Sequence, residues 1–124
     1  MSHDNAGIVR EFIEAWSTLD ADRLASYFCA DACYHNMPME PVSGRDNIRD
    51  FIRGFLTTWT ATAWEIVHLA ATGEIVFAER VDRTQTTAGC VDLPCVGVFV
   101  MEQGRIKVWR DYFDMATYAN AMKA

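Results

Sequence analysis

The sequence is poor in basic residues and has no long hydrophobic run. Eleven Lys and Arg face seventeen Asp and Glu among 124 residues, and the formal net charge at pH 7 is −6. Nucleic acids and anionic membrane surfaces bind proteins through a basic face, so neither is an expected partner. No run of about 18 apolar residues occurs, and the sequence therefore predicts no transmembrane helix.

Cysteine occurs four times, and its spacing does not suit a metal. Cys29 and Cys33 are expected to flank a helix end, and Cys90 and Cys95 flank Pro94. Neither pair has the C-x2-C spacing of zinc ligands, so we expect no metal site. The N-terminal residues show neither a basic nor an apolar leader. We therefore expect a cytoplasmic protein with free thiols.

Several common catalytic and cofactor motifs are missing as well. The sequence contains no Ser-His-Asp elbow, no Gly-rich phosphate loop, no H-E-x-x-H motif and no dinucleotide fingerprint. Hydrophobic residues make up 51% and charged residues 23% of the chain, which is typical of a globular protein. No repeat or linker-like stretch interrupts the sequence, so residues 1–124 are expected to form one domain.

Helical periodicity is confined to the N-terminal half and the C-terminal end. Ile8, Phe12, Ile13, Trp16 and Leu19 recur at helical spacing. A second stripe follows the Ser43–Asp46 cap. The expected helices are Asp4–Thr18, a short one from Asp20 to Phe28, one from the cap through Trp59, and a final turn or two over Met115–Met122.

After Thr60 the apolar pattern changes to period two, which is typical of strands. An extended piece is also expected before the third helix. The expected strands are Ala32–Met37, Trp64–Ala71, Ile75–Thr87, Val91–Met101 and Arg105–Phe113. Helices followed by an antiparallel or mixed meander predict an α+β fold, in which a curved, cone-shaped sheet is packed with N-terminal helices. Such a cone encloses a pocket suited to a small molecule.

Three charged residues fall on strand faces that are otherwise apolar. Arg80 and Asp82 share a face with Val76 and Ala78, and Asp111 lies between Trp109 and Phe113 on the last strand. Buried charges need partners, and the simplest arrangement is one arginine between two carboxylates, bidentate to at least one. From the pattern alone, an exposed network of ion pairs remains an alternative.

A second polar group lies in the segment Tyr34-His35-Asn36. In a strand, Tyr34 and Asn36 point to one side and His35 to the other, so the phenol and the amide could hold a water molecule between them. An ordinary polar strand end is the alternative. His68 lies in an apolar strand and is expected to be a core or rim histidine rather than a catalytic base.

These motifs together resemble the limonene-epoxide hydrolase family, a branch of the nuclear transport factor 2-like or SnoaL-like superfamily. The resemblance rests on the segments Tyr34–Pro38, Glu79–Asp82 and Trp109–Asp114, with support from Gly97-Val98-Phe99. It implies a cone-shaped fold, a homodimer formed across the sheet, and a reaction without metal or organic cofactor. Longer members carry an N-terminal extension that is missing here, which affects pocket closure rather than the chemical groups.

The resemblance also implies roles for five residues. Asp111 would act as the base that activates water, and Asp82 as the acid that protonates the epoxide oxygen. Arg80 would bridge the two carboxylates, while Tyr34 and Asn36 would help Asp111 to position the water. The implied reaction opens a small, largely apolar epoxide to a vicinal diol in one step, without a covalent intermediate.

By position, seven residues are candidates for the walls of the substrate pocket: Phe55, Trp59, Trp64, Thr84, Leu93, Cys95 and Phe113. Two other functions remain open. One is a cone-fold isomerase or polyketide-cyclase-like enzyme with an aspartate base, and the other is a non-catalytic ligand-binding domain. An arginine between two aspartates favours the hydrolase, because neither alternative calls for that arrangement.

Overall fold

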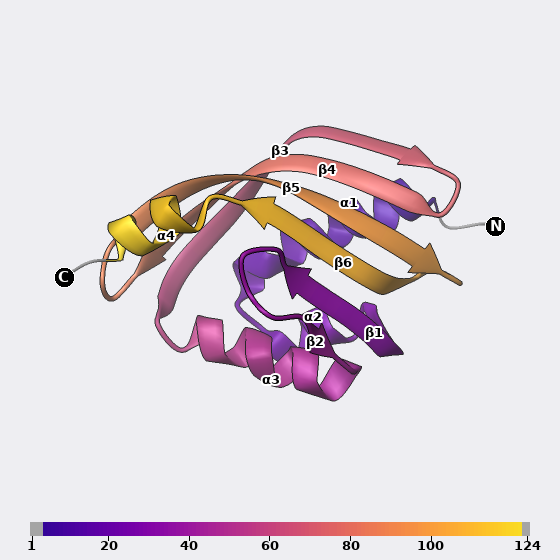
Figure 1. Ribbon diagram of the computed structural model, residues 1–124, viewed down its shortest axis with the longest axis horizontal. Helices are drawn as coiled ribbons and strands as arrows, with labels where there is room; N and C mark the ends of the chain where they lie inside the picture. Colours follow the sequence, from indigo (N-terminus) through magenta and orange to yellow (C-terminus); the bar gives the residue numbers. More distant parts are fainter. Residues whose placement is uncertain (1–3, 123–124) are drawn as a thin grey trace.

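The computed structural model describes residues 4–122, which form an α+β fold (Figure 1). The elements, in chain order, are α1 (Asn5–Ala15), a 3-10 turn (Trp16–Thr18), α2 (Ala21–Ala25), β1 (Phe28–Asn36), β2 (Val42–Ser43), α3 (Arg45–Leu56), β3 (Trp59–Thr72), β4 (Ile75–Thr86), β5 (Cys90–Glu102), β6 (Arg105–Phe113) and α4 (Met115–Ala121). Within this part of the chain, no helix has the length and hydropathy needed to cross a bilayer.

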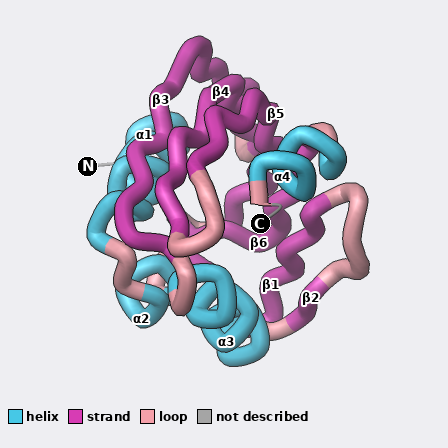
Figure 2. Tube along the Cα trace, turned by 90° about the vertical axis from the view of Figure 1, so that its left-hand side faces the viewer, coloured by secondary structure: helices cyan, strands magenta, loops and turns pink. Residues whose placement is uncertain are grey.

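All the strands belong to one mixed sheet, with the order β2-β1-β6-β5-β4-β3. The pairing of β1 with β6 is parallel, and the other pairings are antiparallel. The sheet is strongly bent but does not close, and α1, α2 and α3 cover its inner side (Figure 1). Figure 2 shows α4 apart from these three helices, beside the end of β5. The expected cone-shaped α+β fold is confirmed.

The first helix begins at a side-chain cap and buries one apolar stripe. Asp4 accepts a hydrogen bond from the backbone N–H of Ala6 at 3.0 Å, which stabilises the helix N-terminus. Val9, Phe12 and Ile13 recur at helical spacing and are completely buried. The helix therefore supplies the inner wall against which the curved sheet packs.

A cluster of aromatic rings fills the centre of the fold. Trp109 on β6 packs edge-on against Phe12 at 5.1 Å between ring centroids and stacks on Tyr34 at 4.2 Å. Its ring also lies parallel to Phe99 of β5 at 5.3 Å. Such pairs each contribute roughly 0.5–1.5 kcal/mol beyond simple burial. The cluster gives the polar residues beside it a rigid support.

Two boundaries differ from the sequence-based prediction. The short second helix ends at Ala25, and β1 already begins at Phe28, so Cys29 and Cys33 lie within a strand instead of flanking a helix end. The register of β1 shifts between Phe28 and Cys33, and this irregularity interrupts the period-two pattern. The tiny strand β2 was not predicted, because two residues are too few to show a period.

The third helix is also shorter than predicted. It ends at Leu56, and Trp59 begins β3 instead of closing the helical stripe. The β-branched residues Thr57, Thr58, Thr60 and Thr62 surround this point and favour extended backbone over helix. The change of period therefore occurs several residues earlier than the apolar pattern alone indicates.

Candidate active site

Arg80 lies completely buried between two aspartates. Its Nε and Nη2 donate to Oδ1 and Oδ2 of Asp82 at 2.8 and 3.0 Å. Its Nη1 and Nη2 donate to Oδ1 and Oδ2 of Asp111 at 2.9 and 2.5 Å. The guanidinium therefore makes a two-bond contact with each carboxylate, which is the strongest geometry available to this pair of groups. The structure excludes the exposed ion-pair network, since the Arg80 side chain is 0% exposed.

The sheet brings the three residues together across an intervening strand. Arg80 and Asp82 point inward from β4, Asp111 points inward from β6, and β5 separates the two strands. Gly97 of β5 lies opposite Asp111 in the register. A Cβ atom at Gly97 would lie 2.8 Å from Arg80 Nη1 and 2.9 Å from Asp111 Oδ1. The contact between Arg80 and Asp111 therefore depends on the absence of a side chain at this position.

Two indole rings hold the polar group in place. The Trp109 Nε1–H donates to Asp111 Oδ1 at 2.9 Å. The Arg80 guanidinium carbon lies 4.5 Å from the centroid of Trp64, at a distance where the ring face attracts a cation. Trp64 in turn stacks on Trp16 at 4.2 Å and donates to Thr62 Oγ1 at 3.0 Å. The orientation of the charged groups is thus fixed by packed aromatic rings.

Burial and the neighbouring charges shift the pKa values of Asp82 and Arg80. Desolvation raises the pKa of Asp82 from 3.8 to about 6, and the charge of Asp111 acts in the same direction, while Arg80 opposes both. Burial alone would lower the pKa of Arg80, but the two aspartates outweigh it and raise the pKa well above its ordinary value. Asp82 can therefore hold a proton near pH 6 beside a guanidinium that stays charged.

Tyr34 and Asn36 are brought next to Asp111 by the parallel pairing of β1 with β6. Tyr34 lies opposite Trp109, and Asn36 opposite Asp111. Both side chains are buried. Burial raises the pKa of Tyr34 well above 10, the charge of Asp111 raises it further, and a hydrogen bond with Asn36 acts against both. Tyr34 therefore remains a neutral phenol that can donate a hydrogen bond.

Neither nearby histidine belongs to this group. His35 faces away from Tyr34 and Asn36, and its Nε2 lies 2.9 Å from the carbonyl oxygen of Met39. The His68 side chain is 81% exposed, and its Nδ1 lies 2.8 Å from Glu79 Oε1. His68 is therefore a surface residue and not the core or rim histidine that the sequence suggested.

A cavity of about 220 Å³ opens beside the polar group. Five of the predicted wall residues line it, namely Phe55, Trp59, Trp64, Leu93 and Phe113, and so do Tyr34, Asn36, Asp82 and Asp111. The cavity is thus an apolar chamber with the two carboxylates, the phenol and the amide gathered on its wall. This combination suits a small apolar molecule with one reactive polar group.

The other two predicted wall residues do not line the cavity. Thr84 is buried, and its hydroxyl oxygen lies 2.8 Å from that of Thr62. Cys95 is buried behind Asp82, and its Sγ lies 3.3 Å from Asp82 Oδ2. Both residues point inward as predicted, but they contact neighbouring strands before they reach the cavity.

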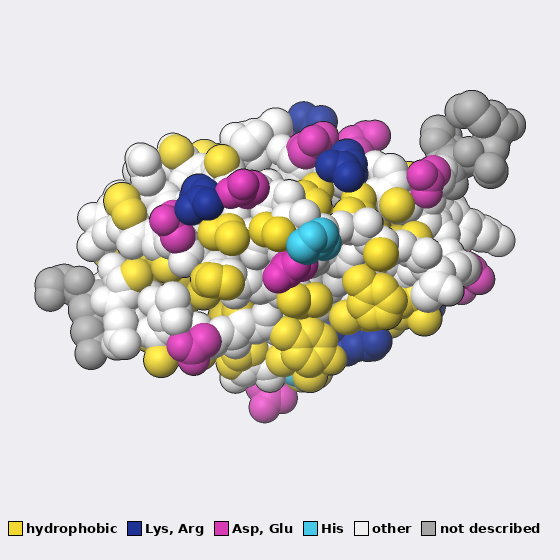
Figure 3. Space-filling view, turned by 90° about the horizontal axis from the view of Figure 1, so that it is seen from above, with side chains coloured by type: hydrophobic (Ala, Val, Ile, Leu, Met, Phe, Trp, Pro, Cys, Tyr) yellow, Lys and Arg dark blue, Asp and Glu magenta, His cyan; other side chains and the backbone are white. Residues whose placement is uncertain are grey.

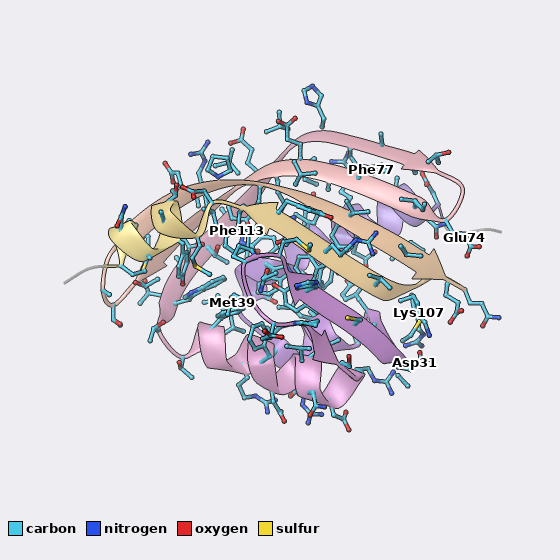
Figure 4. All side chains as sticks on the ribbon, viewed as in Figure 1. Asp31, Met39, Glu74, Phe77, Lys107 and Phe113 are labelled. Carbon is cyan, nitrogen blue, oxygen red and sulfur yellow. The ribbon has the colours of Figure 1, made fainter. Side chains whose placement is uncertain are left out.

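Four wall residues were not predicted from the sequence: Trp16, Met39, Met115 and Tyr118. Met39 belongs to the loop after β1, and in Figure 4 it lies below Phe113, at the same end of the molecule as α4. Met115 and Tyr118 belong to α4, and the Trp59 Nε1–H donates to the Tyr118 hydroxyl at 3.4 Å. The aromatic Tyr118 in a short terminal helix was the one signal that could have indicated this wall.

Within residues 4–122, two groups of side chains have the composition of a metal site. In the first, Asp82, Cys95 and Asp111 each offer one atom, all within 4.8 Å of one another. Arg80 donates four hydrogen bonds to these two carboxylates, so a guanidinium already supplies the positive charge there. The second contains Cys29, Asp31 and Glu102, and here Lys107 lies 2.5 Å from Asp31 (both labelled in Figure 4).

Comparison with known proteins identifies the family of this chain. The profile of the limonene-1,2-epoxide hydrolase catalytic domain matches residues 3–123. Epoxide hydrolase EphG of Mycobacterium tuberculosis is 28% identical over 107 residues, which are 86% of this chain and 71% of that protein. A solved LEH-like epoxide hydrolase of M. tuberculosis has a TM-score of 0.83 and 25% identity, over 95% of this chain and 88% of that chain.

The fold extends beyond hydrolases. A SnoaL-like polyketide cyclase candidate from Shewanella putrefaciens has a TM-score of 0.86 at 14% identity, over 98% of this chain and 97% of that chain, which shows a shared fold alone. The family profile, in contrast, covers nearly the whole sequence, and with it the segments that carry Tyr34, Arg80 and Asp111. The chain therefore belongs to the limonene-1,2-epoxide hydrolase family.

Proposed function

We propose that this protein hydrolyses a small, largely apolar epoxide to a vicinal diol by direct attack of water. The observation that carries the proposal is the buried Arg80, paired through two bonds with each of two carboxylates on the wall of an apolar cavity. An epoxide is strained, so its opening needs an activated water and a proton for the departing oxygen. The site offers a group for each task.

Asp111 is the proposed base. It lines the cavity, lies opposite Asn36 in the register, and is held by Arg80 and by the Trp109 N–H. A water held by Asp111, Asn36 and the Tyr34 hydroxyl would have its proton acceptor and two orienting groups on one wall. The water gives a proton to Asp111 while its oxygen forms the new bond to an epoxide carbon.

Asp82 is the proposed acid. It lines the same cavity, and burial raises its pKa to about 6, so it holds a proton in part of the population near neutral pH. As the epoxide carbon–oxygen bond breaks, Asp82 gives this proton to the oxygen. Asp111 has then gained a proton and Asp82 has lost one, and exchange with solvent restores the starting state.

Arg80 is proposed to keep the two roles apart. Desolvation and the charge of Asp111 raise the pKa of Asp82, while the charge and hydrogen bonds of Arg80 lower it. An isomerase or cyclase with a single aspartate base has no use for a second carboxylate on the same guanidinium. This pairing therefore supports the hydrolase over the isomerase or cyclase.

The cavity supports a substrate of modest size. Its volume of about 220 Å³ corresponds to roughly seven molecules of liquid water, at about 30 Å³ each. Apart from the polar wall, its lining is aromatic or aliphatic, with Trp59, Phe113 and Leu93 among its members. Small cyclic or aromatic epoxides, such as terpene, cyclopentene or styrene oxides, match this size and polarity.

We further propose that the protein forms a homodimer across the outer face of the sheet. Val67, Phe77, Val96 and Tyr112 are between 39% and 46% exposed, and they come from β3, β4, β5 and β6. Hydrophobic side chains gather across this face with charged ones scattered between them (Figure 3), and Phe77 is labelled on it in Figure 4. Light scattering tests the proposal, because a mass of 14.0 kDa would contradict a dimer.

The proposed activity is tested by incubating the purified protein with a panel of small cyclic and aromatic epoxides and measuring diol by gas chromatography. We expect diol formation without added metal, and at least about a hundredfold less diol with Asp111→Asn. The matched control is Asp31→Asn, which removes an exposed carboxylate of β1 that does not line the cavity. A panel on which the folded wild type forms no diol would contradict the proposal.

A further inference from the structure

Cys95 contacts the proposed acid although it does not line the cavity. It lies on β5 directly opposite Arg80 of β4, and its side chain points into the protein, where the residue is 5% exposed. Its Sγ lies 3.3 Å from Asp82 Oδ2 and 3.6 Å from the carbonyl oxygen of Leu93. A single S–H hydrogen can serve only one of these two acceptors at a time.

The thiol keeps this hydrogen. Burial raises the pKa of Cys95 far above its ordinary value, the charges of Asp82 and Asp111 raise it further, and Arg80 acts in the opposite direction. A thiol in this state is a weak hydrogen-bond donor and not a nucleophile. The charge on Asp82 decides its acceptor: the Leu93 carbonyl competes when Asp82 is protonated, and the carboxylate prevails when Asp82 is ionised.

We propose that Cys95 is a positioning residue. Its S–H group donates a hydrogen bond to Asp82 as Asp82 passes its own proton to the epoxide oxygen. This role rests on the proposed function, in which Asp82 is the acid. The O–H bond of Asp82 breaks, the new O–H bond forms on the product alkoxide, and the S–H bond remains intact. Cys95 thus stabilises the carboxylate that the reaction creates without exchanging a proton.

The pKa of Asp82 depends on several groups, and the Cys95 thiol is one of them. Arg80 donates to both oxygens of Asp82, and Oδ2 receives the Cys95 thiol in addition to Arg80 Nη2. Among the described residues, Asp111 from β6 also acts on Asp82, and Asp82 in turn raises the pKa of Tyr34 from β1. Asp111 raises the pKa of Asp82, whereas the bonds from Arg80 and Cys95 lower it. Loss of the thiol should therefore make Asp82 a weaker acid.

Three substitutions separate this role from simple packing. Cys95→Val fills the space without a donor, Cys95→Ala removes both donor and volume, and Cys95→Ser keeps a donor. The protonation midpoint of Asp82 is measured by carbon-13 NMR of labelled aspartate carboxyls, with Asp82→Asn to assign the signal. We expect Cys95→Val and Cys95→Ala to raise the midpoint by about half a pH unit, and Cys95→Ser to leave it at or below the wild-type value.

The second measurement is the turnover of epoxide by each Cys95 variant. In Cys95→Val the alkaline limb of the pH profile should move upward with the NMR midpoint, while the plateau kcat falls roughly threefold to tenfold and KM stays within about twofold. Cys95→Ser should retain kcat close to wild type. A packing role would instead follow side-chain volume, so that Cys95→Ala would be worst and the midpoint would not move.

The controls keep the two proposals distinguishable. Thermal melting establishes that each variant is folded before its titration is compared. An unchanged Asp82 midpoint in folded Cys95→Val, or a Cys95→Ser variant that behaves like Cys95→Val, would overturn the role of Cys95 while the epoxide hydrolase proposal stands. Failure of the wild type to open any epoxide would overturn the proposed function and this role with it.

Discussion

Replacing Gly97 with alanine should disable the site while leaving the fold intact. The added Cβ would lie 2.8 Å from Arg80 Nη1, 2.9 Å from Asp111 Oδ1 and 2.9 Å from Phe99 Cε1. Ordinary carbon contacts begin at about 3.5 Å, so both polar atoms must retreat by more than half an ångström. The hydrogen bond of 2.9 Å between Nη1 and Oδ1 is then lost or badly bent.

The expected loss of turnover follows from this displacement. A misplacement of about 1 Å at a reacting group costs about a hundredfold in rate, so Gly97→Ala should lower kcat/KM by at least tenfold and as much as about a hundredfold. Crowding of a packed interior costs roughly 1–3 kcal/mol of stability, part of which is offset because alanine suits a strand better than glycine. The melting temperature should therefore fall by up to about 10 °C.

The assay compares kcat/KM for epoxide opening with thermal melting in Gly97→Ala and in Gly54→Ala. Gly54 lies on α3, where an added Cβ meets nothing within 4 Å, so this control should keep full activity. If the folded Gly97→Ala protein turned over substrate like wild type, the close contact of Arg80 with Asp111 would not be needed for catalysis, and the account of the site would be refuted.

The remaining predictions concern the three charged residues. Asp111→Asn can no longer accept a proton and should lower hydrolysis at least about a hundredfold in a folded protein, whereas turnover near wild type would remove Asp111 from the mechanism. Arg80→Lys keeps the charge but not the planar donors, so most activity should be lost; near-normal kcat would show that charge suffices. Arg80→Ala should cost about 3–5 kcal/mol in urea unfolding, and a smaller loss would mean that the carboxylates find other partners. Because burial raises the pKa of Asp82 from 3.8 to about 6, wild type loses stability as pH rises through this interval. The free energy of unfolding of Asp82→Asn, relative to that of wild type, should therefore increase by up to about 3 kcal/mol between pH 4 and pH 8. If this difference stayed constant with pH, the burial of the Asp82 charge would be contradicted.

Period-two patterning made the strands and the inward position of the charged residues predictable. Arg80, Asp82 and Asp111 stood out because they interrupt apolar faces, and buried charges require partners. The pattern does not show, however, whether an inward-pointing side chain reaches the cavity. Thr84 and Cys95 point inward as predicted, but neighbouring strands cover them, so they contact Thr62 and Asp82 instead of the cavity.

Long-range pairing was the part that local patterns could not supply. Asn36 meets Asp111 only because β1 pairs in parallel with β6, at the other end of the chain. Met39 and Tyr118 likewise line the cavity only because the loop after β1 and the helix α4 fold against it. Gly97 contributed to the family resemblance in the sequence, but its physical reason lies in the fold, where Arg80 of β4 reaches Asp111 of β6 across β5 at this residue.

The most direct test of direct water attack is a single turnover in heavy-oxygen water with the enzyme in excess over substrate. With Asp111 acting as base on a bound water, the first diol formed must carry the heavy oxygen, and the protein must remain unlabelled. In a route through an aspartate ester, the first diol would take an ordinary oxygen from the carboxylate and the label would enter the protein. Labelled first-turnover diol is the result that the account predicts, and unlabelled diol with a labelled aspartate would contradict it.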